Sequence, residues 1–211
     1  MARTRAAPLL VSNGWSVLFP NPRGSTGRGD AFARAVKGDM GGADVDDILS
    51  GIDMLVEKGW VDTSRVAVTG TSYGGFMSAW LPTRTDRFAA AIPISPVADW
   101  YSQHRTTQIP EFDALFLESS AWDEGGSYFT RSPAFHKQRK PVPTLVMAGG
   151  IDKSTPPSQA LECHFAALRS GAPSGLLTYP NAGHSIRGYP EYIDTAARIV
   201  WWLETHVNRR A

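Results

Sequence analysis

The sequence predicts an α/β fold with a mostly parallel central sheet flanked by helices. Short apolar, β-branched runs, which are typical of buried strands, alternate along the chain with longer segments of helical periodicity. This alternation is typical of α/β proteins. With 211 residues the chain is long enough to bury a sizeable core, so we expect one domain over residues 1–211.

The N-terminal part is expected to contain a helix end, a strand and a loop. The helix end covers residues 8–13 and is closed by Asn13 and Gly14, a pair suited to a helix C-terminus. An apolar strand is expected at 15–20. Residues 21–30 have no periodicity and contain three glycines, so we expect a loop there.

The clearest helix lies between Asp44 and Gly59. Its apolar residues fall on one face at helical spacing: Val45, Ile48, Leu49, Ile52, Leu55 and Val56. Asp44, Asp46 and Asp47 sit near its positive N-terminal end. We interpret them as solvated charges that match the helix dipole, in preference to a metal site.

Four further strands and two helices complete the expected sheet. The strands are expected at 66–69, 89–95, 144–148 and 176–179, and the helices at 157–169 and 189–206. Residues 99–140 lack clean periodicity and are rich in aromatic side chains, which is typical of a lid or a binding excursion.

Composition argues against several classes of partner. The 21 Lys and Arg residues balance 20 Asp and Glu residues, so nothing indicates a nucleic-acid or anionic-membrane partner. No apolar run is long enough to span a bilayer, and the signal-like start at residues 1–5 lacks a cleavage site. The lone Cys163 fits a reducing compartment, so we expect a cytoplasmic protein. Neither a metal-ligand cluster nor a phosphate loop is present, and we expect no cofactor.

A serine flanked by glycines stands between a predicted strand and a predicted helix. The motif runs Gly70-Thr71-Ser72-Tyr73-Gly74. In this context the turn is tight and strained, and it lifts the serine hydroxyl above the sheet at a helix N-terminus. The simpler alternative is a glycine-rich turn with an incidental serine. We favour Ser72 as a nucleophile because an acid and a base suited to activate it lie further along the chain.

Two later strand-end loops supply the partners that a serine nucleophile needs. Asp152 follows the strand at 144–148, and His184 follows the strand at 176–179. Parallel strands end at one edge of the sheet, so Ser72, Asp152 and His184 can converge there. Asp152 alone could instead cap the next helix, and an isolated histidine is more often structural. The joint pattern favours a catalytic triad.

The sequence here resembles the catalytic domain of the prolyl oligopeptidase family of serine peptidases, in particular its acylaminoacyl-peptidase and dipeptidyl-peptidase-like branch. The similar segments are 21–29, 38–47, 70–76 and the loops that hold Asp152 and Gly183-His184. The resemblance implies an α/β-hydrolase fold. It also implies that Ser72 is the nucleophile, His184 the general base and acid, and Asp152 its orienting group.

The same resemblance suggests how substrate is held. The N–H of Tyr73 would be one oxyanion donor. Val97, Trp100 and Tyr101 would help to wall the pocket, and we place Thr155 there as well.

Two elements of the family pattern are missing from this sequence. One is the β-propeller. The other is a strand, ending in a glycine-rich loop, that supplies the second oxyanion donor and lies between the 15–20 strand and the strand before Ser72. Direct pairing of those two strands, a partner chain or a missing N-terminal segment could compensate. Losing one oxyanion donor costs about 3–4 kcal/mol of transition-state stabilisation, which favours activated esters over amides.

These observations predict a serine hydrolase that cleaves peptide or acyl-aminoacyl bonds. A small carboxylesterase is the first alternative. The others are a weakly active fragment that needs a partner chain and a non-catalytic interaction module, and a homo-oligomer remains open.

Overall fold

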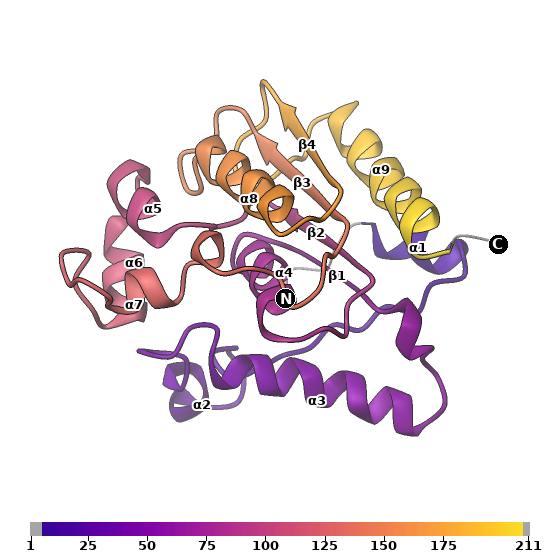
Figure 1. The fold of residues 1–211 in the computed structure, drawn as a ribbon, viewed down its shortest axis with the longest axis horizontal. Helices are drawn as coiled ribbons and strands as arrows, with labels where there is room; N and C mark the ends of the chain where they lie inside the picture. The colour runs from indigo at the N-terminus through magenta and orange to yellow at the C-terminus, as the bar shows by residue number, and fades with distance from the viewer. Residues whose placement is uncertain (1–5, 209–211) are drawn as a thin grey trace.

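The computed structural model describes residues 6–208, so the signal-like start at residues 1–5 lies outside the described part. Four parallel strands form one sheet in sequence order. They are β1 (Ala67–Thr71), β2 (Ala90–Ile94), β3 (Thr144–Gly149) and β4 (Ser174–Tyr179), shown in Figure 1. The predicted α/β class with a parallel sheet is therefore confirmed.

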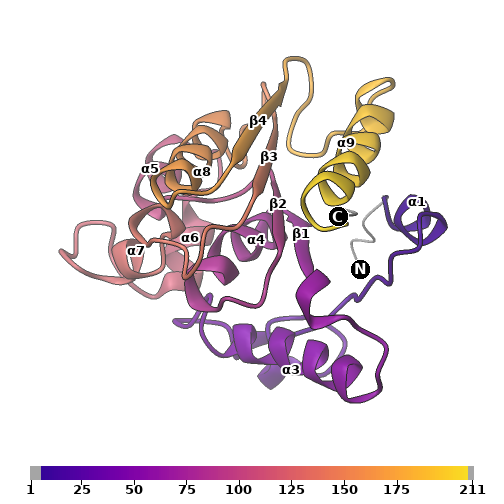
Figure 2. The same cartoon turned by 45° about the vertical axis from the view of Figure 1, so that its right-hand side comes forward.

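Helices cover both faces of this sheet. Figure 2 shows α4 (Tyr73–Arg84) and α8 (Pro157–Arg169) on one face, and α1 (Ala7–Ser12) and α9 (Glu191–His206) on the other. Helix α3 (Ala43–Glu57), in the N-terminal half of the chain, lies beyond the β1 side of the sheet. Two shorter elements precede and follow it, α2 (Asp30–Arg34) and the 3-10 turn η1 (Thr63–Arg65).

The apolar runs of the two central strands are buried on both faces of the sheet, because successive side chains point to opposite faces. In β3, Leu145 and Met147 pack in the cluster with α1 and α9, whereas Val146 and Ala148 pack in the cluster with α8. The central strands β2 and β3 are buried throughout. A continuous apolar run is what such a strand requires.

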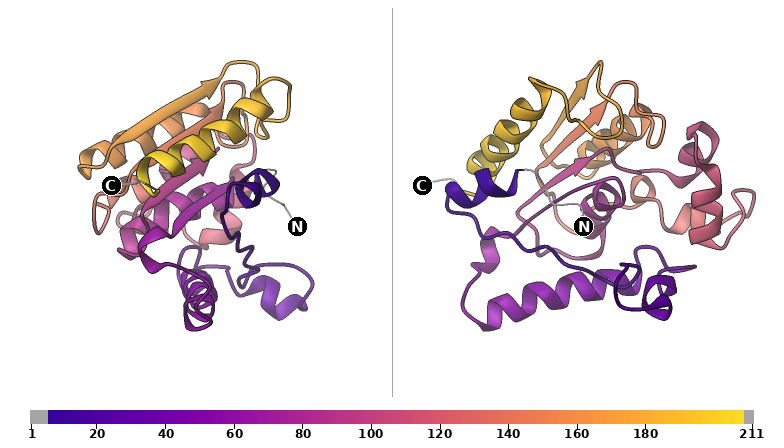
Figure 3. Two further views of the ribbon diagram at one scale, coloured as in Figure 1. Left: turned by 90° about the vertical axis from the view of Figure 1, so that its right-hand side faces the viewer. Right: turned by 180° about the vertical axis from the view of Figure 1, so that it is seen from behind.

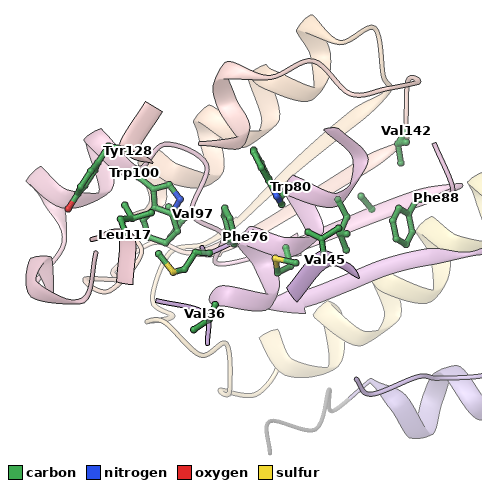
Figure 4. Close-up of a cluster of buried hydrophobic side chains, with 14 of the residues drawn as sticks. Val36, Val45, Phe76, Trp80, Phe88, Val97, Trp100, Leu117, Tyr128 and Val142 are labelled. Atoms are coloured by element: carbon green, nitrogen blue, oxygen red, sulfur yellow. The ribbon is translucent and has the colours of Figure 1, made fainter. Parts of the chain in front are cut away.

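The excursion after β2 is folded and anchored in the core. It contains α5 (Trp100–Thr106), α6 (Pro110–Leu117), α7 (Ser127–Thr130) and the 3-10 turn η2 (Pro133–Phe135). Figure 4 shows Trp100, Leu117 and Tyr128 from this segment in the same cluster as Phe76 and Trp80 of α4. The right-hand view of Figure 3 places the excursion away from α1 and α9. Its helices are too short for periodicity to reveal, and buried aromatic contacts hold them in place.

The strand predicted at 15–20 is not formed, which corrects that expectation. No residue between 15 and 22 belongs to a strand, and among residues 6–208 the strand β1 pairs only with β2. Apolar side chains of this segment still pack on the core, with Trp15 and Val17 against the α1–α9 cluster. An apolar run becomes a strand only when a neighbour supplies its ladder, and direct pairing with β1 does not occur here.

No helix among residues 6–208 combines the length and the apolar character needed to cross a membrane.

Candidate active site

Ser72 sits on a strained turn that only glycine neighbours permit. Its backbone φ is 64° and ψ is −118°, a conformation that non-glycine residues rarely adopt. A Cβ on Gly70 would lie 2.7 Å from the backbone of Gly74, and one on Gly75 would lie 2.5 Å from the carbonyl oxygen of Ile94. Larger residues would push β1, α4 and β2 apart, so the glycines allow the turn that presents Ser72.

The residue after the serine begins α4. Ser72 is the N-cap of α4, and its own N–H is bound to the carbonyl of Ile94 at 3.0 Å. The first N–H groups of a helix have no intrahelical acceptor, and the helix dipole adds partial positive charge there. The N–H of Tyr73 is therefore suited to stabilising a developing oxyanion.

Asp152 and His184 form a hydrogen-bonded pair at the neighbouring strand ends. His184 Nδ1 lies 2.8 Å from Asp152 Oδ2. The other carboxylate oxygen accepts the N–H groups of Ser154 at 2.8 Å and Thr155 at 3.0 Å. The Thr155 hydroxyl lies 2.9 Å from Asp152 Oδ2. The carboxylate is thus buried but surrounded by donors.

These donors determine the charge of Asp152 and the tautomer of His184. Burial by itself raises the pKa of the Asp152 carboxyl, but the hydrogen bonds from His184, Thr155 and Ser154 outweigh it, and the pKa ends below its usual value. An ionised carboxylate only accepts, so Nδ1 of His184 must carry the proton. The neutral ring then has a free Nε2, the atom that a general base uses.

Glycines also bring the aspartate and histidine loops together. A Cβ on Gly149 would lie 2.2 Å from the carbonyl oxygen of Gly183, and one on Gly150 would lie 2.8 Å from that of Pro180. Ser95, at the end of β2, donates its hydroxyl to the carbonyl of His184 at 3.1 Å. The β2, β3 and β4 ends thus hold one another at this edge of the sheet.

A cavity of about 160 Å³ lies where these groups meet. Its lining residues are Ser72, Tyr73, Val97, Trp100, Gln103, Ile109, Phe112, Ser154, Thr155 and His184. None of the hydrogen bonds among the described residues joins Ser72 Oγ to His184. Such contacts are often long before substrate binds.

Of the four residues expected to wall the pocket, three line this cavity: Val97, Trp100 and Thr155. Tyr101 does not. Its ring packs on Tyr128 and Phe135 inside the excursion, because it lies on a different side of α5.

Sequence reasoning missed four lining residues: Gln103, Ile109, Phe112 and Ser154. Ile109 and Phe112 lie at the start of α6, a helix without a periodic signal of its own. For Ser154, the useful signal was its place two residues after Asp152.

The three aspartates at the start of α3, Asp44, Asp46 and Asp47, are not all solvated charges, which corrects the interpretation drawn from the sequence. Asp44 is 1% exposed and accepts the hydroxyl of Tyr73 at 2.5 Å. Burial raises the pKa of the Asp44 carboxyl. Burial also raises the pKa of the Tyr73 hydroxyl, and the nearby Asp44 carboxylate raises it further. Asp47, by contrast, is a partly exposed partner of Arg23, with two side-chain contacts of 2.7 Å. Asp44 therefore holds the side chain of Tyr73, the residue after Ser72.

Comparison with known proteins places this arrangement in a family. The family model described as "Prolyl oligopeptidase family" matches residues 3–210. The chain belongs to the prolyl oligopeptidase family. The four-stranded parallel sheet of the described residues and the helices on it accordingly belong to the α/β-hydrolase fold.

Relatives in this family include peptidases from bacteria, plants and archaea. The chain is 33% identical over 204 residues to the uncharacterized peptidase YuxL of Bacillus subtilis, covering 94% of this chain and 31% of that protein. It is 28% identical to acylamino-acid-releasing enzyme 1 of Oryza sativa, covering 98% of this chain and 28% of that enzyme. The solved acylaminoacyl peptidase of Pyrococcus horikoshii has a TM-score of 0.81 and 27% identity, over 90% of this chain and 32% of that one. The chain thus spans about a third of the length of these prolyl oligopeptidase relatives.

Proposed function

We propose that this chain is the catalytic domain, over residues 1–211, of a serine peptidase that cleaves peptide or acyl-aminoacyl bonds. One observation carries the proposal: Ser72 and His184 line a single cavity, and His184 Nδ1 is hydrogen-bonded at 2.8 Å to a buried, ionised Asp152. Relatives named as acylamino-acid-releasing enzymes support the substrate class.

The reaction proceeds through an acyl-enzyme. Ser72 Oγ attacks the scissile carbonyl carbon while His184 Nε2 takes its proton. The Tyr73 N–H stabilises the negative charge that develops on the carbonyl oxygen. The intermediate then collapses, the C–N bond breaks, and His184 returns the proton to the leaving amine. Water then attacks the acyl-enzyme while His184 takes one of its protons, and His184 returns that proton to Ser72 Oγ as the C–O bond breaks and the carboxylic acid leaves.

The test is reaction of the purified chain with a fluorophosphonate probe, read by intact mass. We expect one probe per chain. Ser72→Ala should abolish labelling because it removes the nucleophile, and His184→Ala should suppress it because it removes the base. A folded wild-type chain that stays unlabelled would contradict the proposal.

A second candidate is a small carboxylesterase. The observation that favours it is the apolar wall of the cavity, formed by Val97, Trp100, Ile109 and Phe112. Esters need less transition-state stabilisation than amides, so they tolerate a weaker oxyanion site. Turnover of short nitrophenyl esters beside aminoacyl anilides separates the two: an esterase hydrolyses only the former.

Three further statements belong to the same proposal. Peptide or ester is the small-molecule partner, with no nucleic acid and no membrane. The side of β1 that no other described strand covers pairs with a partner segment or a second copy, since unpaired edges template pairing. The protein acts in the cytoplasm, a location favoured by its single cysteine, Cys163. Light scattering and localisation of a tagged chain test the last two.

A further inference from the structure

The side chain of Tyr73 connects the oxyanion donor of the proposed function to helix α3. Tyr73 is the first residue of α4, directly after the strained Ser72, and it lines the cavity. Its hydroxyl donates to Asp44 Oδ2 at 2.5 Å. Burial and the neighbouring Asp44 carboxylate raise the pKa of this hydroxyl, so it keeps its proton and stays a donor.

Asp44 occupies a position where a carboxyl group is costly. It is 1% exposed, and its Oδ1 atom has no hydrogen-bond partner among the described residues. Burying a carboxyl group whose oxygens are incompletely hydrogen-bonded costs free energy, which an apolar residue at this position of α3 would avoid. The contact with Tyr73 therefore needs a reason other than packing.

A second tyrosine–aspartate pair shows a different arrangement. The Tyr179 hydroxyl donates to Asp194 Oδ2 at 3.0 Å, and the same carboxylate oxygen accepts Arg198 Nε at 2.7 Å. That aspartate is partly exposed and paired with a cation, and its tyrosine does not line the cavity. Only the Asp44–Tyr73 pair, of these two, leads from a buried carboxyl group to the catalytic cavity.

The start of α3 is itself fixed, so it can hold Tyr73 in place. Arg23 contacts both carboxylate oxygens of Asp47 at 2.7 Å. Trp80 of α4 donates its ring N–H to the carbonyl of Gly41 at 2.7 Å. A Cβ on Gly41 would lie 2.6 Å from that ring nitrogen, so a glycine allows this close approach. Helices α3 and α4 are thus joined twice, once at Trp80 and once at Tyr73.

We propose that Asp44 is a positioning residue for the oxyanion site: it holds the Tyr73 side chain and thereby directs the Tyr73 N–H toward the developing oxyanion. Asp44 is not among the residues that line the cavity, so it acts through Tyr73 and not on substrate. The Ser72 backbone, with φ of 64°, keeps such a conformation only where surrounding contacts fix it. The inference rests on the proposed function and adds to it a residue outside the cavity.

The first test is the turnover of a short nitrophenyl ester by Asp44→Ala. We expect kcat to fall about tenfold and KM to change by less than about twofold, because an oxyanion forms in the transition states and not in the bound substrate. Alanine is smaller than aspartate and does not overpack the buried site. Asp44→Asn keeps a carbonyl that can accept the Tyr73 hydroxyl, so its kcat should stay within about threefold of wild type.

A trifluoromethyl ketone inhibitor gives a readout that a purely structural role would not change. Ser72 Oγ adds to its carbonyl carbon, His184 takes the serine proton, and the former carbonyl oxygen becomes an oxyanion. The Ki of this compound should therefore rise in Asp44→Ala by the factor by which kcat/KM falls. Partial unfolding would lower the apparent kcat and leave Ki unchanged, and that outcome would overturn the inference.

Asp46→Ala is the matched control. Asp46 lies in the same first turn of α3 but is exposed, so its variant should keep the wild-type kcat and Ki.

Tyr73→Phe and the double variant Asp44→Ala/Tyr73→Phe separate positioning from stability. Each single variant leaves one buried polar group without its partner, whereas the double variant removes both, so it should unfold at a higher urea concentration than Tyr73→Phe. Its kcat should nevertheless stay as low as that of the single variants. A double variant that regains wild-type kcat would overturn the inference. Tyr73→Phe alone should show the same fall in kcat and rise in Ki, which keeps the test decisive if Asp44→Ala does not fold.

Fluorophosphonate labelling of the same samples distinguishes this inference from the proposed function. A labelled wild-type chain with unchanged kcat and Ki in folded Asp44→Ala and Tyr73→Phe overturns the inference and leaves the proposed function standing. An unlabelled, folded wild-type chain overturns both.

Discussion

Two fully buried aspartates, one at the strand ends and one in the excursion, have opposite surroundings. Asp152 accepts four contacts, from two backbone N–H groups, one hydroxyl and the His184 ring. Asp113 has no hydrogen-bond partner among the described residues, and its closest cation candidate is His104 Nδ1 at 3.7 Å. Both side chains are 0% exposed.

The difference shows that burial alone does not decide what a carboxyl group does. The pKa of Asp152 is lowered despite burial, whereas burial raises that of Asp113 to about 7. Asp152 lies in a loop at the end of β3, where backbone N–H groups are free to turn toward it. Asp113 lies in the first turn of α6, and no backbone N–H of the described residues donates to its carboxyl group. The hydrogen-bond donors of the strand-end loop thus keep the buried Asp152 carboxylate ionised.

The largest effect is expected from a substitution of Asp152, the aspartate that accepts four hydrogen-bond contacts. Asp152→Asn should lower kcat by about 10⁴-fold, because the asparagine amide favours the His184 tautomer with the proton on Nε2. That atom could then no longer accept the proton of Ser72. Steady-state kinetics on a nitrophenyl ester measures this change.

Circular dichroism of Asp152→Asn is the control for folding. A well-folded variant with activity within tenfold of wild type would show that Asp152 does not orient His184, and would leave the helix-cap role.

The second effect concerns the free energy of unfolding. It arises from Asp113, whose carboxyl oxygens have no hydrogen-bond partner among the described residues. A carboxyl whose folded pKa is raised loses stability as pH rises from its unfolded pKa, about 3.9, to its folded pKa. Asp113→Asn is neutral at every pH and lacks this loss. Its free energy of unfolding relative to wild type should therefore increase between about pH 4 and pH 8, by up to about 4 kcal/mol.

Urea unfolding at several pH values measures that increase. Glu111→Gln, an exposed residue on the same helix, is the control and should show little change. A difference between Asp113→Asn and wild type that is constant with pH would mean that Asp113 titrates normally. Asp152 has the opposite sign: its lowered pKa stabilises the fold above about pH 4, and this is lost as pH falls through the folded pKa.

The smallest effect sharpens the comparison by removing one donor. Thr155→Val keeps the shape of the side chain but removes the hydroxyl that lies 2.9 Å from Asp152 Oδ2 and 3.2 Å from His184 Nδ1. A hydrogen bond to a charged group contributes about 1.5–3 kcal/mol, so we expect a loss of about 10- to 100-fold in kcat/KM. Thr155→Ser restores the hydroxyl and should recover most of the activity. If valine and serine behave alike, the hydroxyl has no part in holding the pair.

The sequence predicted the elements whose signal is local. The strand expected at 144–148 forms as β3, and the helix expected at 157–169 forms as α8 with the same bounds. A buried parallel strand needs an unbroken apolar run, and a helix needs one apolar face, so both patterns are readable without knowledge of the neighbours. The positions of Ser72, Asp152 and His184 at strand ends were predictable for the same reason.

Features that depend on a distant partner were not readable. The apolar run at 15–20 looks like a strand, but no strand of the described residues pairs with it. Asp44 looks like an exposed helix-end charge but lies under the Tyr73 hydroxyl. The orientation of Tyr101 away from the cavity is set by its packing on Tyr128 and Phe135, between short helices whose sequences show no periodicity.

The cavity and the chemistry beside it come from separate stretches of chain. The reacting groups stand at the ends of β1, β3 and β4, whereas much of the apolar wall comes from α5 and the start of α6, which form one insert between β2 and β3 that packs on α4. Substrate preference can therefore be rewritten by exchanging residues of one insert while the triad keeps its setting. Redesign of the substrate preference can thus be confined to residues of the excursion, while the strand-end loops that hold Ser72, Asp152 and His184 are kept unchanged.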